Sequence, residues 1–332
     1  MPQAAPMPAP ALKPLLDVHD LTVEFPHRRG VLKALDQISF SIQRGEILGV
    51  VGESGAGKSL TGAAIVGLLE RPGRIASGRI ILDGQRIDNL PPHQLRRIRG
   101  RRIGTIFQDP LTTLNPLYTI GRQLVETMQT HARLSDTDAR RKAIAWLDRV
   151  GIPAAAQRID AYPHAFSGGQ RQRIVIALAL CAEPVLLIAD EPTTALDVSI
   201  QAQIITLLRD LTRDQGTAVM LITHDMGVIA ETADRVAVMY AGRIAEIGPV
   251  AAVIRHPAHP YTDGLMASIP SLPHRTRRLR QIHGAMPRLD AMPDGCRFHP
   301  RCPHAFQRCT EQPPELLAAG ATHAACWLQA NG

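Results

Sequence analysis

The sequence has few aromatic residues, no long apolar run and no leader-like start, and each shortage excludes a class of protein. Phe, Trp and Tyr make up only 4% of the 332 residues, which argues against stacking platforms for single-stranded nucleic acid. The longest apolar run, residues 174–182, is far shorter than the roughly 20 residues of a membrane-spanning helix. Residues 1–14 are rich in Pro and Ala and lack the pattern of a secretory signal. We therefore expect a cytosolic chain that reaches a membrane only through partners.

The excess of positive charge is confined to one region. The chain carries 37 Lys and Arg against 30 Asp and Glu, a formal net charge of +7 that by itself suggests nucleic acid. Residues 271–310 alone carry +6, whereas residues 1–270 carry only +3. We therefore expect no nucleic-acid partner. The Arg-rich run 275–280 either meets the membrane surface or a partner subunit, or is a solvated linker.

Short apolar runs alternate with helical patterns, which is typical of an α/β protein. A continuous apolar run over residues 46–51 indicates a strand buried on both faces, and a helical pattern follows over 58–69. Residues 110–182 are mostly helical in pattern, and from residue 185 strands and helices alternate again, with a hairpin over 236–248. These patterns predict an α/β core with a helical insertion and an irregular C-terminal extension.

Residues 52–59, Gly-Glu-Ser-Gly-Ala-Gly-Lys-Ser, match the phosphate-loop pattern G-x-x-x-x-G-K-[ST] between a predicted strand and a predicted helix. Glycines let the backbone N–H groups face phosphate oxygens, and the helix N-terminus favours negative charge. We expect Lys58 to reach the β- and γ-phosphates and the Ser59 hydroxyl to ligate Mg²⁺. The residues expected to bind the phosphates are Gly52, Ser54, Gly55, Gly57, Lys58 and Ser59.

Two adjacent acids follow the apolar strand predicted from residue 185. The carboxyl ends of such strands open toward the crevice where α/β sheets bind ligands. Asp190 is predicted to complete the Mg²⁺ shell, and Glu191 to polarise an attacking water as general base. Two adjacent acids could by themselves belong to a solvent-exposed turn. Their occurrence in the same chain as a phosphate loop favours a Mg²⁺ site instead.

The run Phe166-Ser167-Gly168-Gly169-Gln170 makes the sequence resemble the ATPase subunits of ATP-binding cassette (ABC) transporters. Phe166 stands where Leu is commoner in that signature. The resemblance covers roughly residues 15–275 and implies that two subunits pair head-to-tail. Each ATP would then lie between one subunit's phosphate loop and the signature of the other, which here is Ser167, Gly168, Gly169 and Gln170.

The resemblance assigns roles to four further residues. Gln108 is similar to the glutamine that senses Mg²⁺ and water and couples to the membrane subunits, and Asp197 to a residue of the loop that crosses the dimer interface. His224 is similar to the histidine that contacts the γ-phosphate. Phe25 is expected to stack on adenine, with a place in the core as a nearly equal alternative.

The same resemblance implies a fold and a division of the chain. The fold is a P-loop NTPase core of the ABC type with an antiparallel β subdomain and a helical subdomain at about residues 110–182. The expected parts are a flexible tail over 1–14, the nucleotide-binding domain over 15–255 and a C-terminal extension over 256–332.

Four of the five cysteines lie in the C-terminal extension: Cys296, Cys302, Cys309 and Cys326. A cytosolic location disfavours disulfides, and four thiolates suit either Zn²⁺ or an iron–sulfur cluster. The spacing is not that of common zinc modules, so zinc, cluster and free thiols all stay open. Cys181, in the apolar run, is most simply a small core residue.

Residues 259–262 (HPYT) and 295–303 (GCRFHPRCP) resemble the C-terminal extension of dipeptide/oligopeptide permease ATPases. Members of that family carry a 4Fe–4S cluster, so the resemblance implies that the four cysteines are its ligands, with Zn²⁺ as the alternative. We expect a structural rather than a redox-active cluster.

The resemblance implies the ATP-hydrolysing subunit of a bacterial importer of di- or oligopeptides, peripheral at the cytoplasmic face of the inner membrane. Its expected partners are a second homologous ATPase subunit in a heterodimer, two transmembrane permease subunits and an extracytoplasmic peptide-binding protein. Importers of nickel, glutathione or cell-wall peptides look similar and stay as alternatives. A soluble non-transport ABC ATPase is less favoured, because the chain has one cassette and no coiled-coil insertion.

Overall fold

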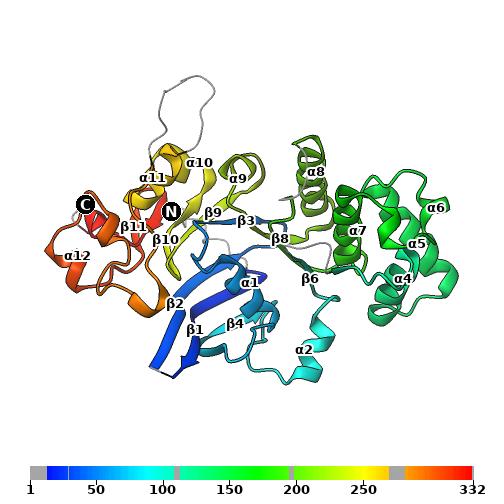
Figure 1. Ribbon diagram of the computed structural model, residues 1–332, viewed down its shortest axis with the longest axis horizontal. Helices are drawn as coiled ribbons and strands as arrows, with labels where there is room; N and C mark the ends of the chain where they lie inside the picture. The colour runs from blue at the N-terminus through cyan, green and yellow to red at the C-terminus, as the bar shows by residue number, and fades with distance from the viewer. Residues whose placement is uncertain (1–12, 29, 108–112, 194–197, 269–280, 331–332) are drawn as a thin grey trace, which may run out of the picture.

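The computed structural model describes residues 13–28, 30–107, 113–193, 198–268 and 281–330. They form two β-sheets, with a group of helices at one end of the molecule and the C-terminal residues at the other (Figure 1).

The larger sheet is mostly parallel and forms the centre of the molecule. Its strands are β3 (Ile47–Val51), β6 (Ile103–Ile106), β7 (Leu186–Asp190), β8 (Ala218–Ile222), β9 (Arg235–Tyr240), β10 (Arg243–Pro249), β11 (Leu317–Ala319) and β12 (Thr322–Ala324). They lie in the order β11-β12-β10-β9-β3-β8-β7-β6, parallel from β9 to β6 and antiparallel from β11 to β9.

The smaller sheet is antiparallel, in the order β2-β1-β4-β5. Its strands are β1 (Leu16–His27), β2 (Gly30–Ile42), β4 (Arg74–Leu82) and β5 (Gln85–Arg86).

Helices lie between and beside the sheets. The α-helices are α1 (Lys58–Val66), α2 (Pro92–Ile98), α4 (Ile120–His131), α5 (Asp136–Arg149), α6 (Ala155–Arg158), α7 (Gly168–Leu180), α8 (Val198–Gln215), α9 (Met226–Thr232), α10 (Val250–Arg255), α11 (Pro260–Ala267) and α12 (Gln307–Glu311). The 3-10 helices are η1 (Pro163–Ala165), η2 (Leu289–Ala291), η3 (His299–Arg301) and η4 (Trp327–Gln329). In the described part of the chain, no helix combines the length and the apolar character needed to cross a bilayer.

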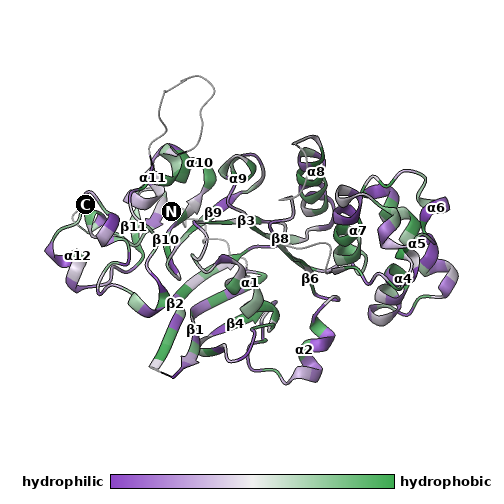
Figure 2. Ribbon diagram, in the orientation of Figure 1, coloured by the Kyte–Doolittle hydropathy of each residue, from purple (hydrophilic) through white to green (hydrophobic). Residues whose placement is uncertain are grey.

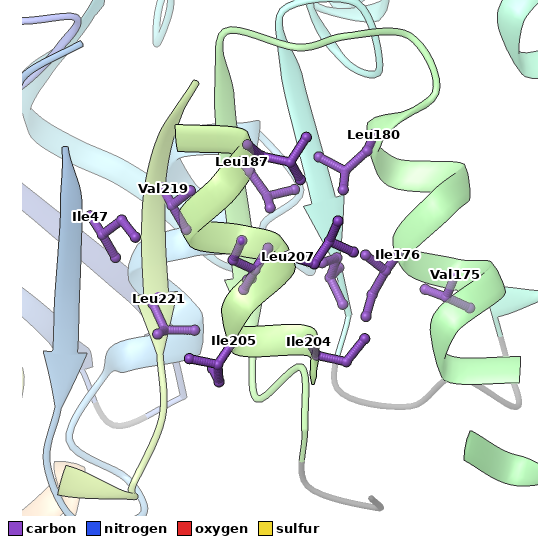
Figure 3. Packing of buried hydrophobic residues seen from close by; sticks show 14 of the residues in the cluster. Ile47, Val175, Ile176, Leu180, Leu187, Ile204, Ile205, Leu207, Val219 and Leu221 are labelled. Carbon is purple, nitrogen blue, oxygen red and sulfur yellow. The ribbon is translucent and has the colours of Figure 1, made fainter. Parts of the chain in front are cut away.

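The central strands are apolar throughout because both of their faces are buried. Successive side chains of a strand point to opposite faces, and in β8 they enter two different hydrophobic clusters. Val219 and Leu221 pack with residues of α7 and α8, as Figure 3 shows, whereas Met220 and Ile222 pack with α1 and the antiparallel sheet. In Figure 2 the hydrophobic colour runs along β3 and β8. The sheet is thus held between two cores, which explains the uninterrupted apolar runs in the sequence.

Helices α4 to α7 form the predicted helical insertion beside the edge strand β6. Helix α5 begins after Ser135, whose side chain accepts a hydrogen bond from the backbone N–H of Asp138 and so caps the helix. Leu147 and Val150 are buried in the core cluster, and Ile144 packs against the same cluster partly exposed. The insertion therefore shares its core with the central sheet.

The predicted fold is confirmed, with two differences in detail. The helix expected over residues 58–69 ends at Val66, because Gly67 adopts a left-handed conformation (φ 69°) and its N–H bonds back to a carbonyl of the last turn. The C-terminal extension, expected to be irregular, adds β11 and β12 to the central sheet, with Glu246 of β10 opposite Ala324 of β12. The hairpin expected over 236–248 is formed by β9 and β10.

A buried carboxylate joins this extension to the core. Glu246 is fully buried and accepts hydrogen bonds from the backbone N–H groups of Ala258 and His259 and from the hydroxyl of Thr322, at 3.0–3.1 Å. A buried charge is tolerated only where it is satisfied in this way. Glu246 therefore ties two C-terminal segments to β10.

We expect Glu246→Gln to destabilise the protein by about 1–3 kcal/mol, because the amide NH₂ group would face backbone N–H donors that the carboxylate now satisfies. Urea unfolding measures the change, and limited proteolysis should show faster cleavage after residue 256. Glu231→Gln, at an exposed position of α9, is the matched control and should leave both readouts unchanged. Equal stability of the two variants would contradict the role of Glu246.

Candidate functional site

The phosphate-loop sequence lies between β3 and α1, at the carboxyl edge of the central sheet. Its backbone takes a shape that glycine alone adopts easily: φ is 151° at Gly52 and 103° at Gly57. A Cβ at Gly52 would collide with the carbonyl oxygen of Met239, and one at Gly57 would lie 2.7 Å from the side chain of Leu35. The loop is therefore pressed against neighbouring strands and requires both glycines.

Lys58 is buried at the start of α1 and turns back over the loop. Its Nζ donates to the carbonyl oxygens of Gly52 (2.8 Å) and Glu53 (3.1 Å). Burial lowers the pKa of Lys58, while the carboxylates of Glu191, Asp190 and Glu53 oppose that shift. The ammonium group is thus surrounded by acceptors and is positioned to meet an anion.

A cleft of about 530 Å³ opens over the loop. This size is within the range of small-molecule and cofactor sites. The residues that line it come from the antiparallel sheet, the loop, the ends of the central strands and the C-terminal extension: Phe25, Ala34, Ser54, Gly55, Gly57, Lys58, Ser59, Leu60, Glu191, His224 and Leu289.

Asp190 and Ser59 meet beneath this cleft, and their geometry fits a divalent cation. The Ser59 hydroxyl is hydrogen-bonded to the Asp190 carboxylate, yet Asp190 Oδ1 is buried without a hydrogen-bond partner. Burial raises the pKa of Asp190, and the bond from Ser59 opposes that rise. An orphaned buried oxygen beside a hydroxyl suits Mg²⁺, which takes few protein ligands and completes its shell with phosphates and water.

Glu191 and His224 both line the cleft, and their side chains contact each other. His224 Nδ1 lies 3.1 Å from Glu191 Oε1, and the Glu191 side chain is 15% exposed against 65% for His224. Glu191 has φ 47°, a conformation that is unfavourable for a residue with a side chain and that clusters at functional sites. The backbone N–H of Glu191 bonds to the carbonyl of Ile222, which holds this conformation in place.

The predicted signature lies at the N-terminus of α7 and is not part of this cleft. Ser167 and Gln170 form a reciprocal capping box, in which each side chain bonds the other's backbone N–H at 3.3 Å. Arg158 supports it by donating to the Gln170 side chain and lying over the ring of Phe166. Gly168, which is exposed, and Gly169, which is partly exposed, form the first turn, so backbone donors there are accessible from outside the chain.

Comparison with known proteins decides the family. A family model described as "ABC transporter" matches residues 35–194, and one described as "Oligopeptide/dipeptide transporter, C-terminal region" matches residues 245–309. The oligopeptide transport ATP-binding protein OppD of Escherichia coli (strain K12) is 48% identical over 300 residues, which are 90% of this chain and 89% of that protein. The chain belongs to the ABC transporter family, as one of its ATPases.

Other relatives agree with this family. The dipeptide transport ATP-binding protein DppD of the same E. coli strain is 44% identical over 91% of this chain and 92% of its own length. Among solved structures, the dimeric ATP-binding cassette MJ0796 in a post-hydrolysis state, bound to ADP and Pi, superposes with a TM-score of 0.65 at 27% identity, over 71% of this chain and 98% of that one. The resemblance stated from the sequence is therefore confirmed for family, fold and ATPase activity.

The structure brings most of the predicted nucleotide residues of this ABC ATPase together. Phe25, the phosphate loop, Glu191 and His224 line one cleft, with Asp190 directly below Ser59. Gln108 and Asp197 lie outside the described residues. The roles of these residues remain predictions.

The cysteines of the ABC ATPase are free thiols in the structure. Cys181 is buried in the core cluster, as predicted, and burial raises its pKa to about 12. Among residues that the structure describes, no group of three or more His, Cys, Asp or Glu is gathered so as to hold a metal ion. Neither the 4Fe–4S cluster nor zinc is therefore supported by the arrangement of these side chains.

Several residues that line or contact the site escaped prediction from the sequence, Ala34 and Leu60 of the cleft wall among them. Glu53 occupies a variable position of the phosphate-loop pattern, and its partner Arg301 is far away in the chain. Tyr261 and Leu289 also belong to the C-terminal segment, and no local pattern places them at the loop. Tyr261 lies in a stretch quoted for its family resemblance, but the resemblance says nothing of this contact.

We expect Glu191→Gln to keep ATP binding within about threefold of wild type and to lower kcat about 10²- to 10⁴-fold, because the amide cannot accept a proton from water. Phosphate release and nucleotide titration measure the two quantities. Glu315→Gln, at an exposed position of the C-terminal extension, is the control. Normal hydrolysis by Glu191→Gln would contradict the general-base assignment.

Proposed function

We propose that this ABC ATPase is the ATP-hydrolysing subunit of a bacterial importer of di- or oligopeptides. The proposal is supported by relatives named as oligopeptide and dipeptide transport ATP-binding proteins, which match about nine-tenths of this chain and of their own length. The match of residues 245–309 to an oligopeptide/dipeptide transporter C-terminal region supports the same assignment. Nickel, glutathione and cell-wall peptides are alternative cargoes that the uptake test below separates.

The chemistry of the site supports ATP hydrolysis by this chain's own residues. Backbone N–H groups of the phosphate loop and the Lys58 ammonium bind the phosphates, and the Phe25 ring lies where it can stack on the base. Ser59 and Asp190 would hold Mg²⁺, which when bound neutralises charge on the phosphate oxygens. Gln108 is proposed to contact this shell and the membrane subunits.

Glu191 is proposed to accept the proton of the attacking water. Its carboxylate lies at the cleft wall, 3.1 Å from His224 Nδ1, so the two side chains can hold one water between the sheet edge and the γ-phosphate. His224 is proposed to hydrogen-bond the γ-phosphate and to orient Glu191. The left-handed backbone at Glu191 fixes this direction before substrate arrives.

The exposed signature at the start of α7 supports a head-to-tail dimer. Because Ser167, Gly168, Gly169 and Gln170 do not line the cleft of their own chain, they are proposed to close the cleft of a second ATPase subunit, with Asp197 at the interface. That subunit is proposed to be a homologue in a heterodimer. Two transmembrane permease subunits and an extracytoplasmic peptide-binding protein are proposed to complete the importer, with this chain peripheral at the cytoplasmic face of the inner membrane.

We expect ATP-dependent accumulation of a labelled tripeptide in proteoliposomes that hold this chain with its permease subunits, its second ATPase and its binding protein. Replacing wild type by Glu191→Gln should abolish accumulation without preventing assembly. Uptake of nickel or glutathione in place of the tripeptide would contradict the peptide assignment.

We also propose that Cys296, Cys302, Cys309 and Cys326 bind a 4Fe–4S cluster, with Zn²⁺ as the alternative. Burial first, and then the neighbouring thiols Cys309, Cys326 and Cys302, raise the pKa of Cys296 to about 11, so the other three sulfurs lie within electrostatic reach of Cys296. Backbone N–H groups of residues 298, 304 and 328 donate to three of these sulfurs. Hydrogen bonds to sulfur stabilise thiolates, the form that metals bind.

Anaerobic purification followed by metal and sulfide analysis tests the thiol site. We expect about four iron and four sulfide per chain, lost in Cys309→Ser and kept in Cys181→Ala. A colourless protein that holds zinc, or one that holds no metal, would contradict the cluster.

A further inference from the structure

The C-terminal segment touches the phosphate loop directly, through the side chain of Arg301. Its Nη1 and Nη2 donate to the two carboxylate oxygens of Glu53, at 2.9 and 3.1 Å, in a bidentate pair. Glu53 is the second residue of the loop, 248 positions away in the chain. The Arg301 side chain is only 6% exposed and the Glu53 side chain 30%, so the arginine side of this pair is shielded from solvent.

The surroundings hold Arg301 in one orientation. Its Nε donates to the carbonyl of His283, and its remaining donors reach the carbonyl of Ile282 and the hydroxyl of Tyr240, at 2.9–3.4 Å. Burial alone would lower the pKa of Arg301, but the bonds to Glu53 and Tyr240 raise it overall, and the guanidinium stays charged.

A second contact holds the backbone of the same loop residue. The hydroxyl of Tyr261, on α11, accepts a hydrogen bond from the N–H of Glu53 at 2.9 Å. The Tyr261 ring is fully buried and packs against Tyr240 and Phe298, with ring centroids 4.7 and 5.4 Å away. Both the side chain and the N–H of Glu53 are thus held by C-terminal residues. Leu289, on η2, extends the same segment to the cleft wall.

Because Glu53 is negatively charged, its ion pair with Arg301 affects how the loop binds an anionic ligand. Its carboxylate acts on Lys58, whose ammonium is held by the Glu53 carbonyl oxygen. Without a counter-charge, an acid in a phosphate-binding loop would repel a triphosphate and would attract Lys58 away from it. Arg301 supplies that counter-charge from the far end of the chain.

We propose that Arg301 and Tyr261 are positioning residues of the nucleotide site, which neutralise and orient Glu53 so that the phosphate loop binds ATP. The C-terminal extension, residues 256–332, then contributes directly to nucleotide binding by the ATPase. This inference rests on the proposed phosphate-binding role of residues 52–59.

The test measures binding of Mg²⁺ and the non-hydrolysable analogue AMP-PNP to the full chain by calorimetry. Arg301→Gln should raise Kd about 3- to 30-fold, because it leaves the Glu53 charge unpaired beside the phosphates. The double variant Glu53→Gln with Arg301→Gln should regain affinity to within about threefold of Glu53→Gln alone, since the charge that needed pairing is gone. A purely structural role of Arg301 predicts no such recovery.

Arg308→Gln is the matched control. Arg308 lies in the same segment, exposed, over the ring of Trp327, and its Nε donates to the side chain of Gln312 and not to the phosphate loop. This variant removes the same charge and should bind AMP-PNP as wild type does. In steady-state hydrolysis, Arg301→Gln should raise KM for ATP and leave kcat within about threefold, because Glu191 and His224 are untouched.

Tyr261→Phe provides an independent measurement should Arg301→Gln fold poorly. It removes only the hydroxyl that bonds the Glu53 N–H, and Kd should rise about 2- to 10-fold. Equal affinity in wild type, Arg301→Gln and Tyr261→Phe would overturn the inference, as would a double variant no better than Arg301→Gln. Lys58→Ala distinguishes failure of the positioning role from failure of the phosphate site. If this variant binds AMP-PNP normally, the proposed phosphate-binding role of residues 52–59 is itself wrong.

Discussion

The parallel strands at the centre of the sheet must bury both faces, and the position of the functional site follows from this constraint. Neighbouring strands β3, β8 and β7 run in register, with Val50 opposite Ile222 and Ile222 opposite Asp190. Their carboxyl ends therefore emerge at one edge, and the polar residues that follow each strand meet there. The pairing of these strands is therefore enough to bring the phosphate loop, the two acids and His224 together at one edge of the sheet.

Contacts between distant parts of the chain then decide how the C-terminal segment joins this core. They rest on two buried carboxylates: Glu246 accepts hydrogen bonds from backbone N–H groups and a hydroxyl of two C-terminal segments, and Asp36 of β2 forms ion pairs with Arg243 and Arg297. Burying a charge without a partner costs free energy of folding. Each of these two carboxylates therefore holds the C-terminal groups that it binds against the core. Some basic residues of the C-terminal region are therefore not surface charges: the largely buried side chains of Arg297 and Arg301 form ion pairs with Asp36 and Glu53 of the core.

Much of the fold and of the candidate site was predictable because the signals are local. The apolar run before Gly52, the glycine spacing of the loop and the acids after β7 each lie within a few residues of one another. Helix α1 ends earlier than predicted, since the left-handed turn at Gly67 outweighs the apolar pattern that continues beyond it. The strands of the C-terminal segment were missed, because three-residue strands leave no periodic signal and form only where β10 offers an edge.

The family, the phosphate loop and most of the element order could be predicted from the sequence alone, because motifs and alternation lie within short stretches of chain. Only the tertiary structure decided that Asp190 Oδ1 is buried beside Ser59 without a partner, that Glu191 faces His224, and that Arg301 reaches Glu53. Such contacts join residues tens to hundreds of positions apart. They depend on how strands pair and on which charges share a buried space, and no local pattern carries that information.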